Sequence, residues 1–248
     1  MRGIMKAFGL APWGVDELAI ATIACGTLGY VLFILLSSYA PWAGYIGLLA
    51  LIPWLIVLQF FRDPDREGPA GPGVMLSPAD GAVTDIVEVE ESKFMQGKCT
   101  RIGIFLSPFN VHVNRTPCDA VVMYVEYKAG EFLPAYNLNA PHRNESCSMG
   151  LLTPDGGKLL VKQITGVLAR RIICDSRIGD RLKAGERYGM IKFGSRTELY
   201  IPVEAGYELN VKLGDKVTGG QTVLCRREIV AQRAPEPETA QSVVNLET

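Results

Sequence analysis

The sequence predicts a mainly β domain of the barrel-sandwich type, with a lipoyl-like repeat, preceded by an N-terminal transmembrane hairpin of two α-helices. Three observations predict this fold class. The run 18–61 contains no charged residue. Short segments rich in Val, Ile and Tyr follow it, separated by Gly, Pro, Asp and Asn, which is typical of strands and turns. The segment 179–186 (GDRLKAGE) returns as 214–221 (GDKVTGGQ), a repeat of turn, inward apolar residue and turn.

The uncharged run predicts a membrane hairpin with helices at about 18–37 and 42–61. A polar, proline-containing break at 37–41 divides it into two lengths that each suffice to cross a bilayer. A cleavable signal peptide has a shorter apolar region and no second span. Arg2, Lys6, Arg62 and Arg66 flank the outer ends and the turn has no basic residue. The positive-inside rule therefore predicts both termini on the cytoplasmic side of the cell (inner) membrane.

The rest of the chain divides into three predicted parts. The segment 62–73 is rich in Pro, Gly and charge and predicts a linker. The β-rich domain is expected over 74–230, with strands near 83–89, 101–106, 120–127, 159–164 and 171–174. The segment 231–248, rich in Pro, Glu, Gln and Ser, predicts a flexible tail.

Composition excludes several classes of function. The formal net charge of −1 argues against nucleic acid as a partner. The six cysteines form no CxxC pair, so we expect reduced thiols and neither a disulfide framework nor a metal site. With only two histidines, His112 and His142, a metallopeptidase site is excluded.

The Gly194-Ser195 pair lies in a predicted kink between two strands. Apolar residues precede it, and the alternation Leu199, Ile201, Val203 follows it. A serine hydroxyl there can attack the preceding carbonyl and convert the peptide into an ester. Elimination across the serine then cuts the chain and leaves dehydroalanine, which hydrolyses to a pyruvoyl group. The pair therefore favours self-cleavage between 194 and 195.

Over about 60–226 the chain resembles the phosphatidylserine decarboxylases, in particular their short prokaryotic form. The resemblance rests on the order and spacing of five segments: 60–66 (FFRDPDR), 77–81 (SPADG), 106–112 (LSPFNVH), 142–145 (HRNE) and 194–195 (GS). It implies a decarboxylase that converts phosphatidylserine in the membrane to phosphatidylethanolamine and CO2 through a Schiff base. The cofactor implied is a pyruvoyl group formed from Ser195, without a metal. The implied partners are the large and small chains of one precursor, with a homo-oligomer possible.

The resemblance also implies the site residues. Asp80, His112 and Ser195 correspond to a triad in which an acid orients a base that activates a hydroxyl. His112 in addition is expected to reprotonate the decarboxylated carbon. The larger bacterial enzymes have a second loop histidine where this chain has Arg115. Whether His112, His142 or Arg115 takes over its role stays open.

The lipid phosphate needs a cation. Arg115, Arg143 and Arg196 are the expected substrate-binding residues, and His142, in a polar loop, is a fourth weak candidate.

A second class of function also fits part of the pattern. A non-enzymatic, membrane-anchored lipoyl-like adaptor or carrier would have an anchor and the same repeats. A carrier needs its modified lysine at a hairpin tip, whereas Lys216 lies early in its turn. An adaptor needs a long coiled coil, and the sequence has no sustained heptads.

Overall fold

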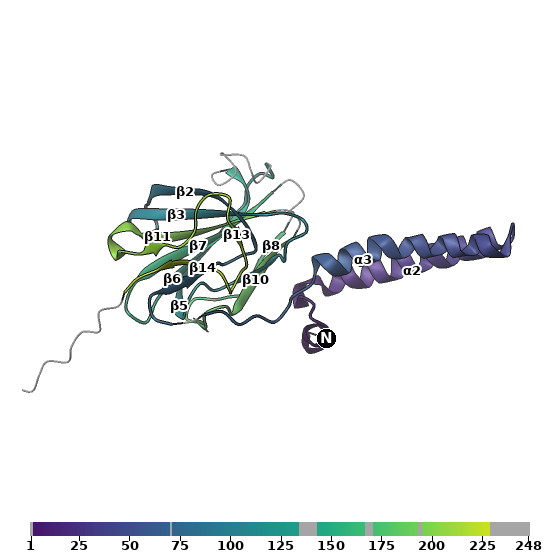
Figure 1. Ribbon diagram of the computed structural model, residues 1–248, viewed down its shortest axis with the longest axis horizontal. Helices are drawn as coiled ribbons and strands as arrows, with labels where there is room; N and C mark the ends of the chain where they lie inside the picture. The colour runs from purple at the N-terminus through teal and green to yellow at the C-terminus, as the bar shows by residue number, and fades with distance from the viewer. Residues whose placement is uncertain (1, 70, 134–142, 167–170, 193–194, 229–248) are drawn as a thin grey trace, which may run out of the picture.

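The computed structural model describes residues 2–69, 71–133, 143–166, 171–192 and 195–228. A long helical arm projects from one end of a β-rich domain (Figure 1). The predicted residues Gly194 and His142 and the predicted tail 231–248 lie outside the described residues.

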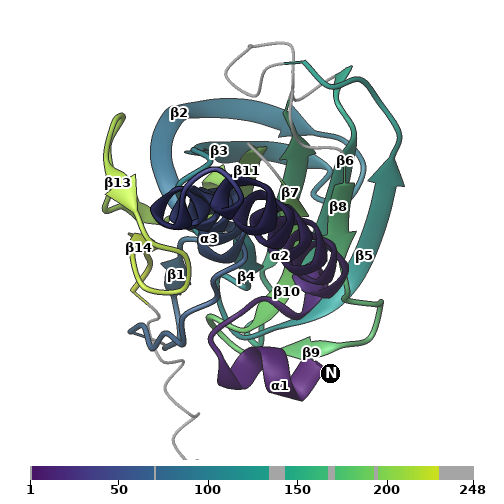
Figure 2. The same ribbon diagram turned by 90° about the vertical axis from the view of Figure 1, so that its right-hand side faces the viewer.

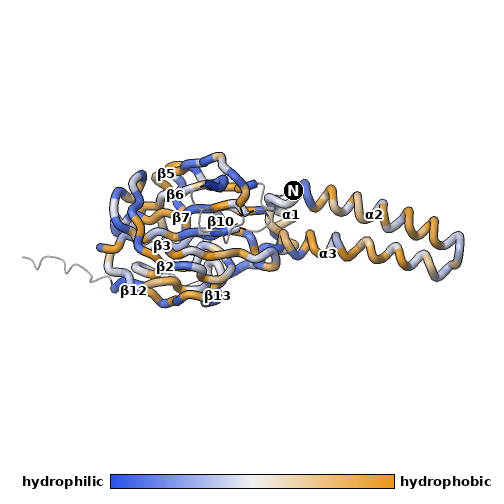
Figure 3. Tube along the Cα trace, turned by 90° about the horizontal axis from the view of Figure 1, so that it is seen from above, coloured by the Kyte–Doolittle hydropathy of each residue, from blue (hydrophilic) through white to orange (hydrophobic). Residues whose placement is uncertain are grey.

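The arm begins with two short helices, α1 (Arg2–Ala7) and η1 (Pro12–Gly14), and continues with α2 (Val15–Ser37), η2 (Pro41–Ala50) and α3 (Leu51–Phe60). Two segments, Pro12–Ser37 and Pro41–Phe60, are long and apolar enough to cross a membrane, judged by length and composition. Figure 3 shows apolar residues along both limbs of the arm. The arm is therefore compatible with membrane association.

The two limbs of the arm approach each other closely at paired glycines. A Cβ atom added to Gly47 would lie 2.5 Å from the carbonyl oxygen of Gly29. Backbone on both sides leaves no room for a side chain, so glycine at 47 permits this packing.

The domain consists of antiparallel strands. They are β1 (Val74–Leu76), β2 (Gly81–Glu91), β3 (Gly97–Leu106), β4 (Val113–Arg115), β5 (Ala120–Lys128), β6 (Ser146–Leu152), β7 (Lys158–Thr165), β8 (Arg171–Cys174), β9 (Arg181–Leu182), β10 (Arg187–Lys192), β11 (Ser195–Pro202), β12 (Glu208–Leu209), β13 (Lys216–Val217) and β14 (Val223–Arg226), with the short helix η3 (Val203–Ala205) after β11. The main sheet has the order β13-β2-β3-β11-β7-β6-β5-β9, and two smaller sheets have the orders β1-β14-β12 and β4-β10-β8.

The main sheet curls into a half-barrel behind the arm (Figure 2). Its concave interior is filled by apolar side chains, among them Ile102, Ile104, Leu106, Met149, Leu151, Leu199 and Ile201. The expectation of a mainly β domain behind an apolar helix pair is confirmed. The narrower barrel-sandwich class stays a prediction.

Strand β11 lies between β3 and β7 and is buried from Ser195 to Ile201. Polar side chains on such a strand need partners, because a buried polar atom that loses water without gaining a hydrogen bond costs about 1–3 kcal/mol. Thr197 accepts from Asn114, and Arg196 is paired with Asp85 and Glu198. This strand begins with Ser195, so the fold places the residue at the edge of a dry, polar-lined core.

The repeat predicted at 179–186 and 214–221 belongs to a larger duplication, which also includes the strand that each copy contacts. The first copy bonds to β5: Val122 N–H donates to the Asp180 carbonyl (2.9 Å) and Gly179 N–H to the Val122 carbonyl (2.8 Å). The second copy bonds to β2 in the same way, through Val83 with Asp215 and Gly214 at 2.9 and 2.8 Å. The segments 116–122 (TPCDAVV) and 77–83 (SPADGAV) lead into these two strands.

This duplication makes Asp119 the counterpart of Asp80. Asp119 Oδ1 accepts the Ala184 N–H at 2.9 Å, and Asp80 Oδ1 accepts the Gly219 N–H at 2.8 Å. Both aspartates thus close the same turn of the same motif. The sequence analysis did not identify this relation, although the two segments share Pro, Asp and Val at equivalent positions.

The arm is docked firmly on the domain. Ala11, Leu18, Phe60 and Phe61 form an apolar cluster with residues 111, 113 and 190 of the domain. Lys192 Nζ pairs with Glu17 Oε1 at 2.5 Å.

The predicted linker is bound at the same junction. Asp63 N–H donates to the Gly9 carbonyl at 2.6 Å, and the Asp63 carboxylate pairs with Arg115 and Arg187. Its first residues therefore hold a fixed path between the arm and the domain.

Candidate active site

Ser195 carries a buried hydroxyl that is left without a partner. The residue is fully buried at the start of β11, opposite Leu106 of β3 and Thr165 of β7. Its Oγ makes no hydrogen bond within the described residues. A buried hydroxyl in this state is costly, and such exceptions mark strained or reactive sites.

His112 presents a second buried atom of this kind. Its ring is fully buried, and Nδ1 lies 2.9 Å from the carbonyl oxygen of Asn110. A carbonyl only accepts, so Nδ1 carries the proton and Nε2 keeps its lone pair. Nε2 has no hydrogen-bond partner among the described residues. The ring is therefore prepared as a base at Nε2.

Burial lowers the pKa of His112 to about 4. The positive charge of Arg62 lowers this pKa further, whereas the Asn110 carbonyl and the charge of Asp80 raise it. At neutral pH the imidazole is uncharged, as a base must be before it accepts a proton.

A tight turn between β3 and β4 holds His112. Asn110 N–H donates to the Ser107 carbonyl at 2.9 Å, and Asn110 Oδ1 accepts the Ser107 N–H at 2.9 Å. The side chain of Asn110 thus closes the turn while its main-chain carbonyl holds the imidazole. The Ser-Pro-Phe-Asn sequence indicates this turn, but the role of the carbonyl depends on the folded geometry.

The topology brings the two segments to the same edge of the core. The turn starts at Ser107, directly after Leu106, the residue paired with Ser195. At its other end, the His112 carbonyl accepts the Ile191 N–H at 3.3 Å, and β4 pairs with β10, the strand that leads toward Ser195.

Asp80 is held by an arginine rather than by the histidine. Its two carboxylate oxygens accept from Arg66 Nη1 and Nη2 at 2.5 and 2.8 Å. The printed contacts of the described residues join Asp80 to Arg66 and Gly219, and His112 to Asn110. Asp80 thus acts on the imidazole through its charge, and its predicted orienting role stays a prediction.

The three expected substrate-binding arginines are already paired. Arg115 is buried, with Nη2 2.9 Å from Asp63 Oδ1, and burial lowers its pKa to about 10, so it stays cationic at neutral pH. Arg196 is buried between Asp85 and Glu198. Arg143 is exposed and pairs with Glu131 at 2.7 Å. Their predicted contact with lipid phosphate stays untested, and each would have to leave a carboxylate to make it.

Arg62 is a cation that the sequence reasoning did not assign to the site. Its guanidinium donates to the carbonyl oxygens of Gln59 and Phe109, both at 2.6 Å. No carboxylate pairs with it among the described residues. It lies where the arm meets the turn that holds His112, and its place in the motif 60–66 is the sequence signal that could have found it.

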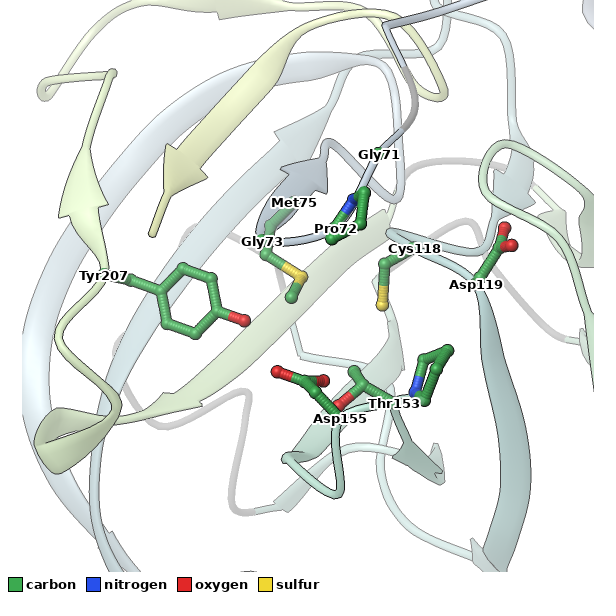
Figure 4. Close-up of a pocket in the computed structure, with 10 residues that line it drawn as sticks. Gly71, Pro72, Gly73, Met75, Cys118, Asp119, Thr153, Asp155 and Tyr207 are labelled. Carbon is green, nitrogen blue, oxygen red and sulfur yellow. The ribbon is translucent and has the colours of Figure 1, made fainter. Parts of the chain in front are cut away.

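A cavity of about 330 Å³ lies elsewhere, next to Asp119 (Figure 4). Cys118, Asp155 and Tyr207 line it. Burial raises the pKa of Cys118 to about 12, so this thiol is not a nucleophile at neutral pH. Two carboxylates and a neutral thiol do not suit an anionic lipid headgroup. Within the described residues no group of three or more His, Cys, Asp or Glu could hold a metal ion.

The fold and site define a β-domain protein with an apolar helical arm, a buried serine whose hydroxyl has no partner among the described residues, and a neutral histidine beside the arm. The sequence profile of the family described as phosphatidylserine decarboxylase matches residues 55–225. The chain therefore belongs to the phosphatidylserine decarboxylase family of enzymes.

Curated relatives agree with this assignment. The chain is similar to a phosphatidylserine decarboxylase proenzyme of Carboxydothermus hydrogenoformans, with 47% identity over 73% of this chain and 84% of the relative. A proenzyme of the same name from Symbiobacterium thermophilum is 43% identical over 77% and 87% of the two chains. The proenzyme from Rhodopirellula baltica is 40% identical over 86% of each.

Proposed function

We propose that this chain is a self-processing, pyruvoyl-dependent enzyme that converts phosphatidylserine in the membrane to phosphatidylethanolamine and CO2. The observation that carries the proposal is a pair of buried atoms without a partner among the described residues, Ser195 Oγ and His112 Nε2. The turn that holds His112 directly follows Leu106, the strand partner of Ser195. Membership of a family whose relatives are named proenzymes supports it.

Self-processing begins with His112 as base. Nε2 takes the proton of the Ser195 hydroxyl while Oγ adds to the Gly194 carbonyl, and the C–N bond breaks to give an ester and a free amine on residue 195. Loss of the α-proton expels the Gly194 carboxylate. The dehydroalanine that remains takes up water and releases ammonia, which leaves a pyruvoyl group at residue 195.

The site fits this group because it is made from Ser195 itself. The fully buried position, with an unpartnered oxygen, gives the group a dry pocket at the end of β11. Bound to the substrate amine as a Schiff base, a pyruvoyl group supplies an electron sink for the electron pair left by CO2.

His112 has a second task after processing. Its pKa is near 4, so an imidazole that has taken up the proton lost by the substrate ammonium readily gives it to the decarboxylated carbon. One imidazole can serve both reactions because they never coincide.

The two chains stay together without a disulfide. The small chain begins with β11, and both neighbours of β11, β3 and β7, belong to the large chain. Strand pairing on both sides and a shared apolar core hold the fragments.

In this proposal the arm lies in the membrane and the site lies beside it, which the length and apolar composition of the two helical segments support. Basic residues at both outer ends of the arm favour a cytoplasmic domain on the inner membrane. Arg62, at the junction, offers a cation to the anionic headgroup.

Intact mass spectrometry of the purified protein tests the proposal. We expect chains of residues 1–194 and 195–248, the second lighter by one ammonia than a chain that starts with serine. Ser195→Ala should stay full length and inactive. A single uncut chain that decarboxylates phosphatidylserine would contradict self-processing. A membrane-anchored adaptor would stay uncut and would not decarboxylate the lipid.

A further inference from the structure

The segment 60–66 contacts both residues expected to activate Ser195. The ring of Phe60 packs on the His112 imidazole, with centroids 4.4 Å apart. Arg62 donates to the Phe109 carbonyl in the His112 turn. Arg66 binds Asp80. The last residue of the arm and two arginines that follow it thus contact His112, its turn and Asp80.

Arg66 binds the Asp80 carboxylate through both terminal nitrogens of its guanidinium. The two bonds measure 2.5 and 2.8 Å, and Nη1 also donates to the Gly219 carbonyl at 2.8 Å. The side chains are 7% and 12% exposed. A two-pronged arginine–carboxylate pair fixes the direction of the carboxylate as well as its charge.

The internal duplication shows that the turn itself does not require this arginine. Asp119 closes the equivalent turn with the Ala184 N–H, and its cation, Lys183, is 81% exposed with Nζ at 3.1 Å. Such an exposed pair contributes little to stability. A buried guanidinium is therefore a property of the Asp80 copy and not of the motif.

The carboxylate that Arg66 fixes is tied to the histidine turn by the backbone. Arg115 N–H donates to the Pro78 carbonyl at 2.9 Å, two residues before Asp80. His112 lies three residues before Arg115, and the charge of Asp80 reaches its ring. A change in how Asp80 is held would therefore be felt at His112.

We propose that Arg66 is a positioning residue for self-processing, which holds the Asp80 carboxylate in place. The proposal rests on the proposed role of Asp80 in processing. Asp63, three residues before Arg66, is paired with Arg115 and Arg187 of the domain, so the segment that carries Arg66 is itself held in place.

A double-mutant cycle on the full chain tests this, with cleavage followed on denaturing gels after synthesis into liposomes. We expect Asp80→Asn to slow cleavage roughly a hundredfold or more. Arg66→Met, which keeps an apolar stem but removes the charge, should slow it at least about tenfold. The double variant should be no slower than Asp80→Asn alone, because Arg66 acts through Asp80.

The duplicate motif supplies the matched control. Lys183→Met, Asp119→Asn and their double variant should cleave at the wild-type rate. Arg66→Lys should fall between wild type and Arg66→Met, because an ammonium keeps the charge but lacks the planar fork. A role in packing alone predicts the opposite order, with Arg66→Met close to wild type.

The outcomes separate the two proposals. Arg66→Met leaves Asp80 as a buried charge without a partner, which can prevent folding. In that case the test uses the double variant, which lacks both charges, and Arg66→Lys. The positioning role would be overturned if the double variant cleaved more slowly than Asp80→Asn, by the product of the two single effects. It would also be overturned if Arg66→Lys cleaved no faster than Arg66→Met. If Asp80→Asn is not cleaved and Arg66→Met is cleaved at the normal rate, only the proposed role of Arg66 is overturned. Normal cleavage of Asp80→Asn overturns the proposed role of Asp80 as well.

Discussion

The imidazole of His112 lies against the ring of Phe60, the last residue of α3, with ring centroids 4.4 Å apart and planes inclined by 35°. A residue that ends the helical arm therefore covers the base of the proposed reaction. Burial is the main cause of the low pKa of His112, and the Phe60 ring of the arm contributes to that burial.

Phe60→Ala should change the pH dependence of self-cleavage. Removing the ring admits water and moves the pKa of His112 from about 4 toward its ordinary 6.5. Cleavage by the wild type should be nearly independent of pH between about 5.5 and 8, whereas the variant should slow below about 6.5. The measurement is the cleavage rate against pH.

Phe94→Ala is the control, since Phe94 stacks on Tyr124 at 5.6 Å, in an apolar cluster separate from the one that contains Phe60. Its pH profile should match the wild type. A flat profile for Phe60→Ala at the normal rate would mean that other atoms keep His112 dry.

Stability should fall in acid because of His112. Its pKa is lowered on folding, so the neutral ring stabilises the fold fully above pH 6.5, and this contribution is lost as the pH falls from 6.5 to about 4. The loss amounts to about 3 kcal/mol.

Comparing Ser195→Ala with Ser195→Ala/His112→Gln, both uncut, isolates this contribution. Between pH 7 and 4 the unfolding midpoint should drop further for the chain that keeps His112. Equal drops would show that the ring is accessible to protons in the folded state.

Arg62→Gln should weaken binding of anionic lipid by the mature enzyme. The expected effect is a rise in KM for phosphatidylserine of roughly tenfold, since a charge-assisted hydrogen bond contributes about 1.5–3 kcal/mol. Arg143→Gln, which removes an exposed arginine paired with Glu131, should leave KM within about twofold. The assay measures CO2 release from the matured fraction. A larger effect at Arg143 would point to the 142–145 segment as the headgroup site.

Gly47→Leu should loosen the helical arm. Its side chain would meet the Gly29 carbonyl at 2.5 Å, and overpacking of this kind costs about 1–3 kcal/mol. Gly26→Leu is a matched control in the same arm, because a Cβ at Gly26 meets no atom within 4 Å. Thermal unfolding in detergent should show a lower midpoint for Gly47→Leu only. Equal midpoints would mean that the limbs separate without cost.

Part of this protein could be predicted from the sequence. The uncharged run 18–61 predicts two apolar helices because any long apolar segment must avoid water, whatever follows it. The Val- and Ile-rich segments predict strands for local steric reasons. The spacing of 77–81, 106–112 and 194–195 indicates the family and leads to Asp80, His112 and Ser195 as the candidate site.

The partners of the charged residues could not be predicted in this way. The contact of Arg115 with lipid phosphate stays a prediction, but its pairing with Asp63, 52 positions away, could not be predicted from the sequence. Arg196 is likewise neutralised by Asp85 from a neighbouring strand. Sequence spacing does not say which charges from distant segments will share a dry interior, where a cation must have a carboxylate.

The state of His112 also depends on the tertiary structure. The sequence by itself determined that an imidazole stands in a Ser-Pro-Phe-Asn turn near a Gly-Ser bond. Only the folded protein decided that the ring is buried, with Phe60 packed against it, and is therefore neutral. The Asn110 carbonyl decided that the proton is on Nδ1, which leaves the lone pair on Nε2 without a partner among the described residues. Residue type fixes the chemistry that is available, whereas burial and hydrogen bonding, which join segments far apart in the chain, decide which protonation state the folded protein holds.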